Sequence, residues 1–254
     1  LINTILRVVT GVSQVGFVVG TEGLEQPMAW ADGRTEENPI TAAEFDCLGA
    51  LDVGTDPFSV SRSLHKDRRG FTIGEGAVGV TICDVNWAKQ NNIPILYYID
   101  GFGDTSGGGH NTEPNGPSQE QAMRMARRRA ERYGNLEGYV FDSGHYTGTY
   151  YGELSEVPRT QNVLEDMQNR TIIYASKRKV GHMLGAAGMM SQFVAGRVLQ
   201  TGIVPGMRFD GEMMDELYGW NVPTETYYNP DVQVALVNQF GFGDANVSLI
   251  LRRV

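Results

Sequence analysis

The sequence contains little cysteine and little histidine, and it has no long apolar run. Its 254 residues include two cysteines, Cys47 and Cys83, and four scattered histidines. This spacing predicts neither a disulfide framework nor a zinc site, and it fits a reducing compartment. No apolar run approaches the roughly 20 residues that cross a bilayer, and no signal peptide is visible. We therefore expect a cytoplasmic protein with no metal site and no membrane partner.

Positive charge is also scarce. The chain has 21 Lys and Arg against 30 Asp and Glu, which gives a formal net charge of −9. Proteins that bind nucleic acid are more often basic, so we expect no nucleic-acid partner. Hydrophobic residues make up 41% and charged residues 20%, as in ordinary globular proteins, and the length is sufficient to bury a core.

Segments of strand type and helix type alternate along the chain, which predicts an α/β fold. Glycine-rich residues 101–117 are expected to form a long loop, and residues 24–40 a surface excursion. The clearest helix begins with Ser118 as its N-cap and Gln121 as the capping-box partner. The predicted strands are 14–19, 71–84, 94–100, 136–141, 171–175, 232–237 and 247–251, and the predicted helices are 1–9, 41–51, 86–90, 118–133, 155–168 and 184–200.

Two histidines with glycine neighbours are the candidate functional residues. His145 lies between Gly144 and Gly148, and His182 follows Gly181. Imidazole donates or accepts protons near neutral pH, and two imidazoles on separate loops can hold one oxyanion. Small neighbours would let a thioester arm approach. A histidine beside a glycine is more often structural, and the spacing alone leaves that alternative open.

Five blocks of sequence, two of which hold these histidines, follow one another along the chain. In these motifs and their order the chain resembles the β-ketoacyl synthases, the condensing enzymes of the thiolase-like superfamily. Glu153 and Glu156 stand where that family has an acidic pair downstream of its first histidine. The blocks are residues 20–22 (Gly-Thr-Glu), 68–77 (Arg-Arg-Gly-Phe-Thr-Ile-Gly-Glu-Gly-Ala), 145–149 (His-Tyr-Thr-Gly-Thr), 177–188 (Lys-Arg-Lys-Val-Gly-His-Met-Leu-Gly-Ala-Ala-Gly) and 238–248 (Asn-Gln-Phe-Gly-Phe-Gly-Asp-Ala-Asn-Val-Ser).

The resemblance implies a thiolase-like fold of layers in the order αβαβα. Residues 1–92 would be the remainder of the N-terminal half, which is the end of the first α/β repeat. Residues 93–254 would be the C-terminal half, which is the whole second repeat. The implied reaction is a decarboxylative Claisen condensation of an acyl thioester with malonyl-carrier protein, in fatty acid or polyketide synthesis.

The resemblance also implies roles for particular residues. His145 and His182 would stabilise the enolate oxygen and assist decarboxylation. Lys177 would orient the pocket around His145, and Glu156 would hold Lys177 or a nearby water. The main-chain N–H of Phe242 would form half of an acyl oxyanion hole. Thr147 and Thr149 would contact the pantetheine arm of the substrate. Phe240 and Phe242 would form a gate for the acyl chain; the alternative for these two phenylalanines is core packing.

The nucleophilic cysteine of the family has no counterpart here. Cys47 falls on a predicted helix and Cys83 in a predicted strand, and we expect both to be small buried hydrophobic residues. Because residues 1–9 look like part of a buried helix, we expect the chain to be a piece of something longer. The cysteine would then come from an N-terminal segment or subunit. The implied partners are that segment, an acyl carrier protein with its phosphopantetheine, and a second subunit in a homo- or heterodimer; no bound cofactor is implied.

Three substitutions depart from the family motifs. Tyr146 replaces a glycine, which is expected to bring bulk to the pocket side of its loop. Arg69 replaces an aspartate, and Asp244 replaces a glycine after the Phe-Gly-Phe-Gly turn. Glu75 is expected to be a buried structural carboxylate.

Two other functions remain open. The absent cysteine and Tyr146 favour a non-catalytic partner similar to the chain-length-factor subunits of ketosynthase heterodimers. Retention of the two histidines with Lys177, Glu156 and the Phe-Gly-Phe-Gly turn favours the enzyme. A thiolase or another acyl-CoA enzyme is less consistent with the motif that contains His182.

Overall fold

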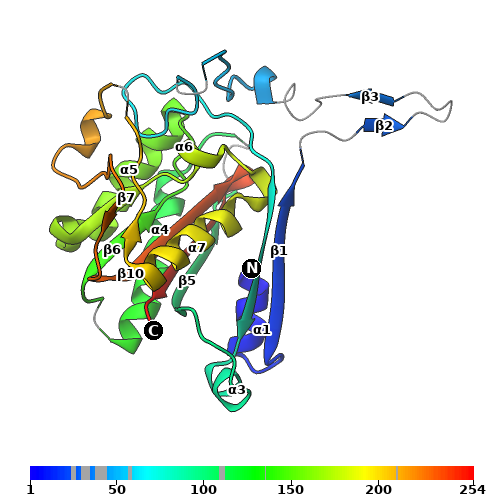
Figure 1. Ribbon diagram of the computed structural model, residues 1–254, viewed down its shortest axis with the longest axis vertical. Coiled ribbons are helices and arrows are strands. Elements are labelled where there is room, and N and C mark those ends of the chain that lie inside the picture. Colours follow the sequence, from blue (N-terminus) through cyan, green and yellow to red (C-terminus); the bar gives the residue numbers. More distant parts are fainter. Residues whose placement is uncertain are drawn as a thin grey trace.

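The computed structural model describes residues 1–23, 27–29, 35–37, 45–56, 59–108, 112–134, 136–209 and 211–254. Two sheets organise the chain (Figure 1). The smaller sheet pairs β1 (Val15–Glu22) with β4 (Gly76–Cys83) in antiparallel fashion. The larger, mixed sheet has, in spatial order, β5 (Tyr98–Ser106), β11 (Ala245–Arg252), β10 (Val232–Gly241), β6 (Tyr139–Ser143) and β7 (Thr171–Tyr174).

Helices separate and cover these sheets, as the α/β prediction requires. Helix α7 (Leu184–Thr201) packs on β10 and β6 from one side and on β1 and β4 from the other. Helix α4 (Gly116–Ala130) covers the opposite face of the large sheet, and α5 (Tyr150–Leu164) packs on α4. The other elements are α1 (Ile2–Val9), α3 (Val85–Gln90), α6 (Lys177–Val180), the 3-10 turns Glu131–Tyr133, Glu165–Arg170, Asp215–Leu217 and Phe242–Asp244, and the short pairs β2 (Pro27–Ala29) with β3 (Thr35–Glu37) and β8 (Ile203–Val204) with β9 (Tyr227–Tyr228).

The core occupies both faces of the large sheet. Along β10, Val234 and Leu236 pack in the cluster on the α4 side, whereas Ala235 and Val237 pack in the cluster on the α7 side. This period of two is that of a strand buried on both faces. It explains why residues 234–237 are four consecutive apolar residues.

The prediction for residues 94–117 was wrong at both ends. The strand begins at Tyr98 instead of Pro94, and it continues to Ser106 through residues expected to form a loop. Its glycines serve close packing: a Cβ on Gly101 would lie 2.0 Å from the carbonyl oxygen of Ala126, and one on Gly103 would lie 1.8 Å from that of Ala122. Helix α4 therefore approaches β5 so closely that two glycines are needed inside a strand.

Helix boundaries also differ from the prediction. Helix α4 begins at Gly116, and its N-cap is Asn115, whose side chain accepts a hydrogen bond from the Ser118 N–H. Ser118 is buried and bonds Thr105 on β5 instead. Helix α5 begins five residues earlier than the expected start at 155, and of the helix expected over 41–51 the structure describes helical residues only at 45–47. Most of the surface excursion expected at 24–40 lies outside the described residues.

The register of the large sheet aligns the ends of β6 and β7 with Val237 in β10. Ser143 at the end of β6 pairs with Tyr174, the last residue of β7, and with Val237 of β10. Strands β6, β7 and β10 run parallel to one another. The residues that follow Ser143, Tyr174 and Val237 therefore lie on the same side of the sheet, at the carboxyl ends of β6 and β7. His145, Lys177 and Gln239 all follow within three residues of these positions.

None of the helices in the described part of the chain is long and apolar enough to cross a bilayer.

Substitution of Gly103 tests the contact between α4 and β5. Gly103→Ala would drive its Cβ into the helix backbone, and we expect the protein to lose about 1–3 kcal/mol of unfolding free energy, the usual cost of overpacking a core. Gly23→Ala is the matched control, because a Cβ there meets no atom within 4 Å. Urea denaturation of both variants would measure the difference, and equal midpoints would contradict the close packing.

Candidate functional site

His145 is presented by the loop that follows β6. The carboxylate of the buried Glu156 accepts hydrogen bonds from the N–H of His145 at 2.6 Å and of Tyr146 at 2.8 Å. On the other side, the Lys177 Nζ donates to the carbonyl oxygen of His145 at 2.6 Å. The main chain of His145 is thus held from both sides by buried ionisable side chains. Burial and the neighbouring Asp142 raise the pKa of Glu156 to about 8, and the two N–H donors oppose that rise.

His182 is placed by a different segment. Its N–H donates to the Thr72 carbonyl at 2.7 Å and its carbonyl accepts from the Gly74 N–H at 3.0 Å, so residues 72–74 bind it as a strand would. A Cβ on Gly74 would lie 2.2 Å from the Val180 carbonyl oxygen, which explains the glycine in this motif. Phe71 packs edge-on against the His182 ring, with centroids 4.7 Å apart.

The imidazole rings of His145 and His182 lie close together. Their ring centroids are 5.5 Å apart and their planes are nearly perpendicular. Burial lowers the pKa of both rings well below the usual value, and the positive charge of Lys177 lowers both further. Both rings are therefore neutral at pH 7, a state in which each offers one donor nitrogen and one acceptor nitrogen.

Lys177 lies beside His145, as predicted, at the start of α6. It is 2% exposed, and burial lowers its pKa to about 8, against the opposing charges of Glu156 and Glu153. Glu156, expected to hold Lys177 or a nearby water, makes its hydrogen bonds to the His145 loop and acts on Lys177 electrostatically. Glu153 binds the N–H groups of Leu64 and Gly148 and pairs with Arg68 at 3.2 Å.

Gln239 joins the histidine pair, and the sequence analysis missed it. Its Oε1 lies 3.1 Å from the His145 Nδ1 and 3.5 Å from the Lys177 Nζ. Its position two residues beyond the point where β10 pairs with the end of β6 was the signal that could have found it. That signal depends on strand register, which motif spacing does not give.

A pocket of about 1350 Å³ opens over both histidines. Thr147 and Thr149 line it, with their hydroxyl oxygens 2.9 Å apart, as do Phe240 and Phe242. Phe240 is 8% exposed and packs beside His145, whereas Phe242 is 56% exposed. The alternative of core packing therefore fits Phe240 but not Phe242. No cysteine is among the described residues that line this pocket.

Two of the three departures have a structural explanation, and for Tyr146 it differs from the expected one. Tyr146 is fully buried and donates from its hydroxyl to the Asp142 Oδ2 at 2.6 Å, so its bulk enters the core and not the pocket. Asp244 has φ 60°, a conformation that aspartate tolerates better than most residues. Its carboxylate accepts from Asn115 and Asn246 at the pocket rim.

Arg69 is the third departure. Its guanidinium pairs with the buried Asp52 at 3.1 Å while remaining 61% exposed, and it lines the large pocket. The ion pair therefore places a cation at the pocket wall.

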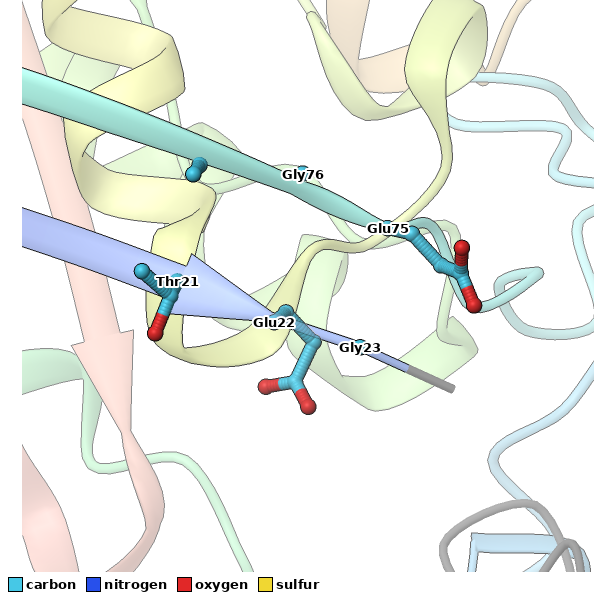
Figure 2. A pocket seen from close by; sticks show the side chains of 6 residues that line it. Thr21, Glu22, Gly23, Glu75 and Gly76 are labelled. Carbon is cyan, nitrogen blue, oxygen red and sulfur yellow. The ribbon is translucent and has the colours of Figure 1, made fainter. Parts of the chain in front are cut away.

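Two further expectations were wrong. Glu75 is exposed instead of buried, and it lines a smaller hollow of about 790 Å³ beside the end of β1 (Figure 2). Glu22, across that hollow, accepts from the Gly185 N–H in the first turn of α7 at 3.1 Å, where a helix favours a negative charge. Cys47 is exposed, and Cys83 in β4 is partly buried, so neither is a buried hydrophobic residue.

Known proteins are similar to this chain in sequence and in fold. The family model described as beta-ketoacyl synthase, C-terminal domain, matches residues 97–208. The 3-oxoacyl-(acyl-carrier-protein) synthase 1 of Haemophilus influenzae is 31% identical over 236 residues, which cover 90% of this chain and 55% of that protein. The chain is similar to the C-terminal part of β-ketoacyl synthases, and it spans little more than half the length of the curated relatives it matches.

Solved structures confirm the predicted thiolase-like layered fold. A β-ketoacyl synthase from Burkholderia phymatum STM815 superposes with a TM-score of 0.84 at 26% identity, over 99% of this chain and 58% of that one. The ishigamide ketosynthase/chain length factor superposes with a TM-score of 0.80 at 24% identity, over 98% of this chain and 56% of that one. The second likeness concerns the fold alone.

Removal of the Lys177 charge should change the titration of both imidazoles. In Lys177→Met we expect the pKa of His145 and of His182 to rise, because the neighbouring cation no longer opposes their protonation. Imidazole proton signals followed by NMR against pH would measure both. Lys179→Met, an exposed lysine on the same short helix, is the control. Unchanged titration in Lys177→Met would show that the charge does not reach the rings.

Proposed function

We propose that this chain is the histidine-bearing part of a β-ketoacyl synthase. The reaction would be a decarboxylative Claisen condensation between an acyl thioester and malonyl-carrier protein, in fatty acid or polyketide synthesis. The observation that carries the proposal is the convergence of His145 and His182, with ring centroids 5.5 Å apart, over a pocket of about 1350 Å³. Two neutral imidazoles at this separation can act on one small oxyanion.

Each predicted site residue would keep a defined role. His145 and His182 would stabilise the enolate oxygen and assist decarboxylation, and Lys177 would orient His145. Glu156 would act indirectly, by fixing the His145 loop. The remaining site residues line the pocket, which supports their proposed contacts with substrate. Thr147 and Thr149 would contact the pantetheine arm, and Phe240 and Phe242 would contact the acyl chain. The main-chain N–H of Phe242 would form half of an oxyanion hole.

The nucleophilic cysteine would come from an N-terminal segment or subunit. Support comes from one face of β1, where Val15, Phe17 and Val19 are 37%, 69% and 52% exposed. Contiguous exposed apolar surface of this kind usually faces another part of the protein. We assign residues 1–92 to the remainder of the N-terminal half and 93–254 to the C-terminal half. The further partners would be an acyl carrier protein, which brings its own phosphopantetheine, and a second subunit.

One observation favours a second candidate. No cysteine lines the pocket within the described residues, as in a chain-length-factor-like subunit that supports an active synthase. The two functions differ in whether the histidines of this chain are needed for decarboxylation.

Replacement of His182 tests the catalytic proposal. In the protein assembled with its cysteine-bearing segment or subunit, His182→Ala should lower the rate of malonyl-carrier decarboxylation about 10²–10³-fold, the usual cost of losing one oxyanion donor. Tyr218→Ala is the control, because Tyr218 is 94% exposed and outside the pocket. A rate that His182→Ala leaves unchanged, in an assembly that still needs this chain, would favour the chain-length-factor function.

A further inference from the structure

The side-chain amide of Gln239 is fixed at both ends. Its Nε2 donates to the Ser191 Oγ on α7 at 3.0 Å, and its Oε1 faces His145 at 3.1 Å and Lys177 at 3.5 Å. The ammonium of Lys177 has only donors, so it attracts the amide oxygen and repels the amide NH₂. The orientation with Oε1 toward His145 therefore follows from charge as well as from distance.

That orientation decides which nitrogen of His145 carries the proton. Oε1 offers only lone pairs, so its contact with Nδ1 is favourable when Nδ1 bears a hydrogen. The competing donor to a bare Nδ1 is the Lys177 Nζ at 3.3 Å, a longer contact, and this amino group already donates to the His145 carbonyl at 2.6 Å. In a neutral ring, a proton on Nδ1 leaves Nε2 as a lone pair.

His182 is held in the opposite state. Its Nδ1 accepts the main-chain N–H of Leu184 at 3.2 Å, so the proton of the neutral ring lies on Nε2. Both rings line the same pocket, and neither Nε2 makes a hydrogen bond within the described chain.

We propose that Gln239 is a positioning residue that holds His145 in the Nδ1-protonated tautomer, so that the pocket presents one imidazole acceptor, the His145 Nε2, and one imidazole donor, the His182 Nε2–H. The assignment of the two tautomers does not depend on the function proposed above, but the roles of the two imidazoles toward the substrate rest on that function. His182 then donates the imidazole hydrogen bond to the enolate oxygen, and His145 accepts one from an N–H or O–H group of the carrier-bound substrate. This assignment revises the shared role proposed above: within the histidine pair only His182 stabilises the enolate oxygen, and His145 assists through a second group of the same ligand.

Long-range ¹H–¹⁵N NMR of the assembled protein, labelled at histidine, tests this directly, because Nδ1–H and Nε2–H imidazoles give different nitrogen shifts. Loss of a signal in His145→Ala assigns His145. We expect Nδ1–H for His145 and Nε2–H for His182 in the parent protein. Gln239→Met keeps a similar volume without an acceptor and should shift the His145 tautomer ratio toward Nε2–H about tenfold, the worth of one hydrogen bond. Gln239→Glu keeps an acceptor oxygen and should retain Nδ1–H.

His182 is the internal control, because its partner is a main-chain N–H that neither variant removes. An Nε2–H signal for His145 in the parent protein would overturn the inference, as would an unchanged ratio in Gln239→Met. Decarboxylation measured on the same samples separates the two proposals: a parent protein with the expected tautomers and no decarboxylation contradicts the proposed function alone.

Discussion

The site depends on two buried ionisable side chains that hold the main chain of one residue. Glu156 accepts a hydrogen bond from the N–H of His145 and Lys177 donates one to its carbonyl, so the loop after β6 is fixed from both sides. Buried polar groups are costly unless they are hydrogen-bonded, and here the peptide units of the loop supply partners for both side chains. Among the described residues none makes a hydrogen bond to the pocket-facing edge of the imidazole, so this edge is available for a ligand.

Much of this could be predicted from the sequence, because strands buried on both faces and glycine-flanked motifs leave local signals. The run at 232–237 predicted β10, and the motifs at 145–149 and 177–188 predicted the two histidines that meet. Residues 98–106 could not be predicted in the same way. Their glycines signal a loop locally, and only the closeness of α4 makes them strand residues.

Gln239 and Tyr146 show the same limit at the site. The contact of Gln239 with His145 is fixed by the pairing of β10 with β6, a relationship between residues about 90 positions apart. The direction of the Tyr146 side chain depends on a free acceptor beneath the loop, the Asp142 carboxylate. Burial raises the pKa of Asp142 to about 7, and the hydroxyl of Tyr146 opposes that rise. Motif comparison detects such substitutions but not which way they point.

Tyr146 also restricts its neighbour. A Cβ on Gly144 would lie 2.1 Å from the Tyr146 ring, so no other amino acid fits at position 144 while the tyrosine is present. A glycine at 146 would remove that restriction and leave the Asp142 carboxylate without its hydroxyl partner. Residues 144 and 146 are therefore coupled: a side chain at position 144 requires that the aromatic ring at 146 be removed or moved, so substitutions at these two positions are not independent.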